Sequence, residues 1–275
     1  MRATILSTIL EPMEPAVPLR IAVLGLGEAG SIYAADLARQ GASVTACDVA
    51  ATAVPPGVNP AKDIPEAVRG AGVVLSLVGG QAAEAALKEA LPAMEPGGIF
   101  ADMNTSGPAQ KQLLANRAAE NGILFADVAV LAPVPRARIK TPLVLSGTGV
   151  SELLRILSQL GIPASSVGNK AGVAAELKLL RSVFMKGLSA TVLESVTAAR
   201  AVGAEEWVVS QIASELGPDA HALIPRILEG TPAHALRRED EMRQARSLLE
   251  SLGVPHSMTD GAIEWLHALS QSEPT

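Results

Sequence analysis

Short apolar runs alternate with helix-like stretches up to about residue 168. The runs are rich in Val, Ile, Leu, Phe and Ala and cover residues 21–24, 43–47, 72–78, 98–103, 123–130 and 143–146. Apolar runs this short, with Gly, Asp or polar residues at their ends, are typical of strands buried on both faces. The segments between them place apolar residues at helical spacing. The alternation predicts an α/β fold: a doubly wound, open parallel sheet with helices on both faces.

The pattern changes after Lys170. Residues 171–200 contain few helix breakers and predict one long helix, and shorter helices are expected at 205–216, 219–228, 234–252 and 260–270. No strand is expected after about residue 167. We therefore divide the chain into a loose N-terminal extension (1–18), an α/β domain (19–168) and an all-α C-terminal domain (169–275), which the long interdomain helix enters.

The long helix is apolar over much of its circumference, and one small helical domain does not easily cover it. We therefore expect residues near 171–200 to pack across the interface of a homodimer. Among the local signals, Asp63 and Ser151 are predicted N-caps and Pro108 predicts a first helical turn. Gly41 is expected where the first helix ends.

Composition restricts the classes of function. Hydrophobic residues make up 48% of the chain, so a sizeable core is available, and the net charge of −6 argues against a nucleic-acid partner. No apolar stretch reaches the length of a membrane span. The single cysteine, Cys47, excludes a disulfide within the chain and fits a cytoplasmic protein. The four histidines lack metal-ligand spacing, so no metal site is predicted.

A glycine motif follows the first apolar run. It reads Gly25-Leu26-Gly27-Glu28-Ala29-Gly30 and leads into a predicted helix. Gly25 allows a tight turn, Gly27 lets the backbone approach a pyrophosphate, and Gly30 lets the helix pack against the strand. The N–H groups at the start of the helix then face the phosphates. Strand, glycines and helix together predict a Rossmann dinucleotide-binding domain.

Asp48 ends the second predicted strand, 23 residues after Gly25. An acidic residue at this distance is expected to accept a hydrogen bond from a ribose 2′-hydroxyl. Residues 49–54 contain no Arg or Lys that could bind a 2′-phosphate. The prediction is therefore NAD, with NADP not excluded. The alternative is that Asp48 is an ordinary turn residue at a strand end.

Further candidate residues follow other predicted strands. Ligands bind such sheets at the carboxyl ends of the strands. Val78 and Gly79 follow the strand at 72–78, Asn104 and Thr105 follow the strand at 98–103, and Leu131 follows the strand at 123–130. We expect these residues and the glycine motif to line one crevice.

The segment GLGEAGSIYAADLARQGASVTACD resembles the β-hydroxyacid dehydrogenase family, which includes 3-hydroxyisobutyrate and 6-phosphogluconate dehydrogenases. LSLVGG at 75–80 is similar to the family's second cofactor loop, and DMNTSGP at 102–108 to the turn that packs near the nicotinamide ribose. The C-terminal region looks like that of an uncharacterised, shorter subgroup. The resemblance implies a Rossmann domain, NAD(P) and hydride transfer to or from a small hydroxyacid.

The resemblance also implies a catalytic lysine on the interdomain helix. In GNKAGVAAELKLLRS, Lys178 matches that lysine, and Ser182 stands where the family has an asparagine. Both lie on one face of a helix. Between Leu177 and Leu179, Lys178 would be desolvated, which lowers the pKa of an amine and suits general acid–base work. The alternative is a lysine that extends from an amphipathic helix into solvent.

The substrate loop departs from the family. Leu131 stands where the family has a serine that contacts the substrate carboxylate, so the substrate is not a simple 3-hydroxyisobutyrate or gluconate analogue. We expect an anionic small molecule, oriented by Arg181 and Ser182. Arg136, Arg138 and Lys140 are further candidates for anion binding or, alternatively, a solvated surface loop.

The sequence therefore predicts an NAD(P)-dependent oxidoreductase that acts on a CH–OH group, with Lys178 as general acid–base. Two alternatives remain. One is an imine reductase with the same fold, and the other is a dinucleotide sensor that keeps the glycine motif but needs no lysine at the nicotinamide.

Overall fold

A computed structural model describes residues 19–50, 53–217 and 219–271 of the chain. The predicted extension at 1–18 lies outside these residues. The α/β part contains eight strands: β1 (Arg20–Leu24), β2 (Ser43–Cys47), β3 (Asn59–Pro60), β4 (Val73–Ser76), β5 (Ile99–Asp102), β6 (Leu124–Val130), β7 (Leu143–Ser146) and β8 (Ala164–Ser166). They form one sheet in the order β3-β2-β1-β4-β5-β6-β7-β8. The predicted Rossmann fold is confirmed.

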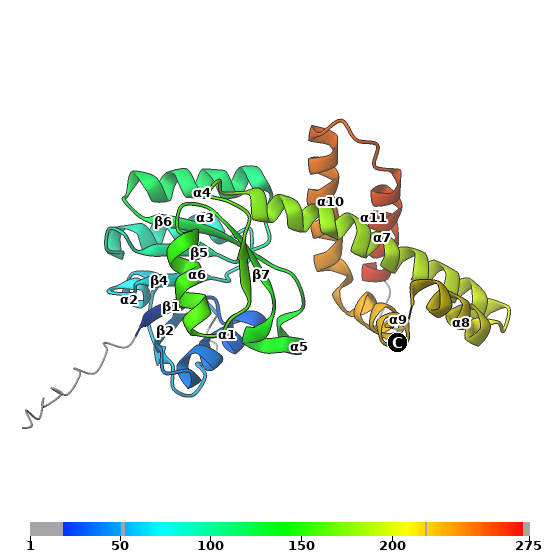
Figure 1. Cartoon of the computed structure of the whole chain (residues 1–275), viewed down its shortest axis with the longest axis horizontal. Helices are drawn as coiled ribbons and strands as arrows, with labels where there is room; N and C mark the ends of the chain where they lie inside the picture. The colour runs from blue at the N-terminus through cyan, green and yellow to red at the C-terminus, as the bar shows by residue number, and fades with distance from the viewer. Residues whose placement is uncertain (1–18, 51–52, 218, 272–275) are drawn as a thin grey trace, which may run out of the picture.

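The helices of this part lie on both faces of the sheet (Figure 1). They are α1 (Glu28–Arg39), α2 (Ile64–Val68), α3 (Ala83–Ala90), α4 (Pro108–Glu120), α5 (Val134–Ala137) and α6 (Val150–Gln159), with short 3₁₀ turns at Leu91–Ala93 and Arg138–Lys140. Successive β1 side chains divide between the two cores: Val23 packs with α1 and α6, and Leu24 packs with α2, α3 and α4. This division is the reason that the strand is apolar from Ile21 to Leu24.

Two strands, β7 and β8, run opposite to the other six and so depart from the predicted parallel arrangement. β7 pairs antiparallel with β6, with Val128 opposite Leu145, and β8 then follows β7 in parallel. The connection between β6 and β7 contains only the one-turn helix α5 and a 3₁₀ turn. A parallel crossover usually runs through a full helix that packs on the sheet, and this connection has none, so the chain turns back instead.

The local signals fare differently. Asp63 is the N-cap of α2, where its Oδ1 accepts a hydrogen bond of 2.8 Å from the Glu66 N–H. Gly41 follows α1 with a φ of +87°, which a helix end of this type requires. The prediction that Ser151 is an N-cap is wrong, because Ser151 lies inside α6, which begins at Val150 and has Gly149 as its N-cap.

The C-terminal region is helical and opens with α7 (Val173–Ala201), a helix of 29 residues. It continues through α8 (Glu205–Leu216), α9 (Ala220–Gly230), a 3₁₀ turn at Pro232–His234, α10 (Ala235–Ser251) and α11 (Ser257–Gln271). In Figure 1, α7 runs out from the Rossmann sheet, and α10 and α11 pack across it. The predicted long helix and the helices after it are confirmed.

An apolar stripe remains uncovered on α7 in the single chain. Leu177, Leu180 and Phe184 are exposed, with Phe184 67% accessible. Their spacing places them along one side of the helix. The homodimer through this helix stays a prediction. Among the described residues no helix is long and apolar enough to cross a membrane.

Candidate active site

The glycine loop has the shape that the sequence predicts. Gly25 has a φ of +89°, and a Cβ there would lie 2.6 Å from the Leu77 carbonyl oxygen. A Cβ on Gly30 would lie 1.9 Å from the Gly25 carbonyl oxygen, so close helix–strand packing requires this glycine. A Cβ on Gly27 would meet no protein atom within 4 Å. The space in front of Gly27 and the start of α1 is therefore open, as pyrophosphate binding needs.

Glu28 and Ala29 form the first turn of α1, for which Gly27 is the N-cap. Asp48 reaches this loop from the end of β2. Its Oδ2 accepts a hydrogen bond from the Leu26 N–H, and its Oδ1 accepts one of 2.8 Å from the Ala50 N–H. Asp48 therefore joins the second strand to the glycine loop, and its role toward a ribose stays a prediction.

The ends of β4 and β5 are linked through Asn104. Its Oδ1 accepts a hydrogen bond of 2.7 Å from the Gly79 N–H, and its Nδ2 donates one of 3.0 Å to Ser76 Oγ. Gly80 lies so near Thr105 that a Cβ would approach the Thr105 carbonyl oxygen to 2.4 Å. Val78 is partly buried beside the core on the α3 side of the sheet. The predicted cofactor residues thus form one continuous edge.

Lys178 lies at the end of this edge. Its Nζ donates a hydrogen bond of 2.9 Å to Thr105 Oγ1, across 73 residues of sequence. Burial lowers the pKa of Lys178 to about 8. Glu241 opposes this shift, while the positive charges of Lys111, Lys186 and Arg237 add to it. The side chain keeps partial access to solvent.

The start of α7 is fixed by a buried polar cluster. Asp127 of β6 lies opposite Asp102, where the pairing with β5 ends. It accepts hydrogen bonds from the Gly172 and Ala175 N–H groups, at 3.1 and 3.0 Å. Ser146 Oγ accepts a further one of 3.0 Å from Ala174. These groups satisfy the free N–H groups of the helix end, and Asp127 places its charge at the positive end of the dipole. They set the position of Lys178 two turns later.

Lys111, which the sequence analysis did not single out, completes this cluster. It lies on α4, is 1% exposed, and its Nζ is 2.9 Å from Asp102 Oδ2 and 3.3 Å from Asp127 Oδ1. Desolvation acts to lower the pKa of Lys111, but the two carboxylates outweigh it and hold the pKa above its usual value. The available signal was an aspartate at the end of one strand, a lysine on the helix that follows it and an aspartate within the next strand.

The predicted substrate residues are scattered. Ser182 is 1% exposed, and its hydroxyl donates to Glu241, one helix turn beyond Lys178. Arg181 is exposed on the same helix, and Leu131 is partly exposed, with its N–H bonded to the Pro142 carbonyl. Their roles toward a substrate stay predictions.

Two of the three basic loop residues have partners within the chain. Arg138 pairs with Asp36 of α1 at 2.7 Å. Lys140 donates a hydrogen bond of 2.6 Å to the Gly161 carbonyl. Arg136 is exposed. The surface-loop interpretation therefore accounts for Arg138 and Lys140 without a bound anion.

Residues 20–161, just over half of the chain, match the NAD-binding domain of 6-phosphogluconate dehydrogenase. The chain belongs to this family. Residues 199–269 match a domain of unknown function, DUF1932. The 6-phosphogluconate dehydrogenase-like domain carries the glycine loop, Asp48 and the Asn104–Thr105 turn, and the DUF1932 match covers α10 with Glu241. Lys178 lies on α7 between the two matched regions.

Relatives of full length share the architecture. A conserved hypothetical protein from Sinorhizobium meliloti 1021 is 31% identical, with a TM-score of 0.73 over 94% of this chain and 92% of that one. A 3-hydroxyisobutyrate dehydrogenase from Mycobacterium tuberculosis is 19% identical, with a TM-score of 0.78 over 92% and 94% of the two chains. At that identity the likeness shows the fold alone.

A curated relative from Methanothermus fervidus is an uncharacterized 28.5 kDa protein, 28% identical over 154 residues. The matched segment spans 56% of this chain and 59% of that protein. The fold is therefore that of the NAD(P)-dependent dehydrogenases and reductases, joined to a C-terminal domain of unknown function.

Proposed function

We propose that this protein is an NAD(P)-dependent oxidoreductase that interconverts a CH–OH group and a carbonyl on a small anionic substrate. The observation that carries the proposal is the position of Lys178. Its amine hydrogen-bonds Thr105 at the carboxyl edge of the sheet, on the turn next to the cofactor loops. A lysine whose pKa is about 8 is a competent proton donor and acceptor near neutral pH.

When bound, the nicotinamide supplies or accepts the hydride. In the reducing direction Lys178 donates its proton to the carbonyl oxygen while the carbonyl carbon receives the hydride, and the product is a hydroxyl group. In the oxidising direction the neutral amine of Lys178 takes the hydroxyl proton. Thr105, which accepts a hydrogen bond from the ammonium, would hold it at the carboxyl edge of the sheet.

NAD is the proposed cofactor. The Asp48 carboxylate at the glycine loop would repel the 2′-phosphate of NADP and accept a hydrogen bond from the 2′-hydroxyl of NAD. The open space at Gly27 and the unpaired N–H groups at the start of α1 fit the pyrophosphate.

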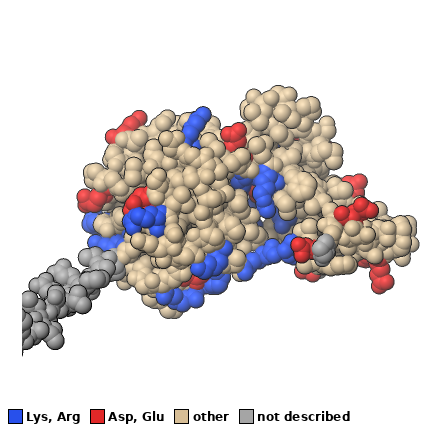
Figure 2. Space-filling view, viewed as in Figure 1, with Lys and Arg blue, Asp and Glu red and all other residues tan. Residues whose placement is uncertain are grey.

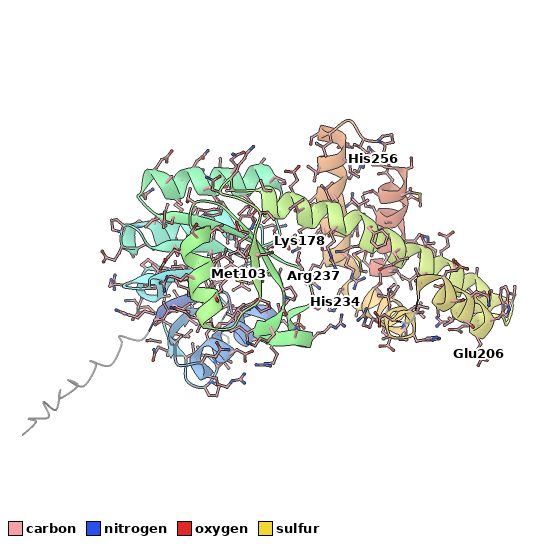
Figure 3. All side chains as sticks on the ribbon, in the orientation of Figure 1. Met103, Lys178, Glu206, His234, Arg237 and His256 are labelled. Atoms are coloured by element: carbon pink, nitrogen blue, oxygen red, sulfur yellow. The ribbon has the colours of Figure 1, made fainter. Side chains whose placement is uncertain are left out.

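An anionic substrate is supported by the charges around the lysine. Figure 2 shows Lys and Arg side chains gathered where the Rossmann domain meets the helical region. Figure 3 places Arg237 of α10 beside Lys178, and its charge is close enough to lower the pKa of that lysine. Arg237 is exposed, and its fork of donors suits a carboxylate, phosphate or phosphonate.

The test is a spectrophotometric screen at 340 nm with NAD(H) and NADP(H). The panel contains β-hydroxyacids, the matching oxoacids, and their phosphorylated and phosphonate analogues. Lys178→Met is expected to lose turnover by at least about a hundredfold, since general acid–base catalysis contributes that much, while cofactor binding stays intact. Lys170→Met is the matched control, because Lys170 is exposed just before the same helix.

Other outcomes favour the alternatives. Turnover that survives in Lys178→Met contradicts the role of the lysine. Cofactor binding without turnover on any substrate supports the dinucleotide sensor. Turnover with cyclic imines but with no oxoacid supports the imine reductase.

A further inference from the structure

A row of polar side chains lies on one face of α7. Lys178, Ser182 and Lys186 follow one another at intervals of four residues, which places them on the same side of the helix. Buried polar side chains on an otherwise apolar helix need partners. The partner here comes from α10, which packs against α7.

Glu241 of α10 binds two members of this row. Ser182 donates its hydroxyl hydrogen to Glu241 Oε1, and Lys186 Nζ lies 3.0 Å from the same oxygen and 3.1 Å from Ser182 Oγ. The side chains of Glu241 and Lys186 are 13% and 14% exposed. A buried pair of this kind costs desolvation energy, so stability alone gives little reason to place it here.

The charges around Lys178 come from three elements. Lys111 of α4, Lys186 of α7 and Arg237 of α10 are positive, and Glu241 of α10 is negative. Burial acts to raise the pKa of Glu241, but Lys186, Lys178 and the Ser182 hydroxyl outweigh it and lower the pKa. Glu241 is therefore ionised at neutral pH and offsets part of the positive field.

We propose that Glu241 is a positioning residue of the active site: it fixes Ser182 and Lys186 on α7 and supplies the negative charge that stabilises the Lys178 ammonium. The charge keeps the proton donor loaded for reduction of a carbonyl. The inference rests on the proposed function, in which Lys178 donates this proton to the substrate. It assigns the C-terminal domain a part in the chemistry that is done at the Rossmann edge.

The experiment reads the charge of Lys178 without turnover. Full-length protein is labelled with acetic anhydride between pH 6 and 11, and mass spectrometry gives the midpoint of labelling at Lys178. Glu241→Gln is expected to move the midpoint down by about one pH unit, since a nearby opposite charge shifts an amine by roughly that amount or more. Asp240→Asn is the matched control, because it removes the same charge from an exposed neighbouring position.

A second variant, which removes a positive charge, keeps the proposal testable if Glu241→Gln does not fold. Lys186→Met removes a positive charge that competes for Glu241 and is expected to raise the Lys178 midpoint. A midpoint unchanged in both variants, or an equal shift in Asp240→Asn, overturns the proposal. The labelling shifts are measured without substrate. A turnover screen that finds no activity therefore contradicts the proposed function, while the effect of Glu241 on the charge of Lys178 can still be measured. Turnover that depends on Lys178, without the shifts, defeats the positioning role alone.

Discussion

Two lysines near the carboxyl edge of the sheet have opposite environments. Lys111 on α4 is almost fully enclosed and contacts two carboxylates, Asp102 at 2.9 Å and Asp127 at 3.3 Å. Lys178 on α7 is partly accessible and binds a neutral hydroxyl, Thr105. The two therefore differ in their charged partners as well as in their exposure to solvent.

The consequence is a difference in acidity. Burial acts to lower the pKa of both amines, but the paired aspartates raise that of Lys111, whereas the pKa of Lys178 falls to about 8. A fully paired lysine is a structural link, here between β5, β6 and the start of α7. A lysine with too little negative charge around it can release its proton, which makes it a candidate for catalysis. Burial alone therefore does not identify a reactive lysine.

The largest effect is expected from Lys111→Met. It leaves Asp102 and Asp127 buried without a cation, which costs about 3–5 kcal/mol of unfolding free energy. Urea denaturation at pH 7 measures the loss. Lys88→Met, at an exposed position on α3, is the control and should change the free energy of unfolding by less than about 0.5 kcal/mol. A loss in Lys111→Met as small as in the control would show that the cluster is not a structural link.

Lys178→Met should change the pH dependence of stability, because Lys178 is a buried amine without a carboxylate among the described residues that pairs with it directly. The folded-state pKa of about 8 lies below the unfolded value, so the unfolded chain binds more protons between pH 8 and 10.5. Wild-type stability should rise relative to the variant by roughly 2 kcal/mol across that range and lose this gain as the pH falls toward 8. Urea denaturation at several pH values measures the difference. A difference that stays constant with pH would mean that Lys178 titrates as in the unfolded chain.

A third change affects the cofactor edge and neither lysine. Gly27→Ala adds a Cβ that meets no protein atom, so stability should hold while NADH binding weakens by about tenfold, or roughly 1.4 kcal/mol. Fluorescence titration and thermal unfolding give the two values. Gly187→Ala, in open space within α7, should leave NADH binding unchanged. Unchanged NADH binding in Gly27→Ala would show that the pyrophosphate does not bind at this loop.

The smallest effect is expected from Thr105→Val. The substitution keeps the shape of the side chain but removes the oxygen that accepts the Lys178 hydrogen bond. The loss of this hydrogen bond should lower the free energy of unfolding by about 1 kcal/mol. Without that acceptor the ammonium is less stable, so acetic anhydride should label Lys178 with a lower pH midpoint than in the wild type. An unchanged midpoint would show that the hydroxyl does not contribute to the lysine's charge state.

Much of the fold could be predicted from local patterns. The glycine loop, six strands and the helix that opens at Val173 each produce a signal within a few neighbouring residues. β8 was missed because three residues give too short a pattern. The direction of β7 was missed because it depends on the connection before it, which lacks the full helix typical of a parallel crossover.

The candidate site was predictable in part for the same reason. Lys178 and Ser182 share a helix face by spacing alone, and both are where that spacing places them. The hydrogen bond to Thr105 spans 73 residues and the contact of Ser182 with Glu241 spans 59, so neither has a local signal. The role of Lys111 depended on the pairing of β5 with β6, which places Asp102 and Asp127 side by side next to α4.

The sequence by itself determined the dinucleotide-binding loop, the order of the elements and the lysine at the start of the long helix, because these depend on backbone geometry and periodicity over short distances. Only the tertiary structure decided which charges surround that lysine. Electrostatic interactions act through space and depend on burial, so packing of α4 and α10 against α7 sets the proton affinity of Lys178.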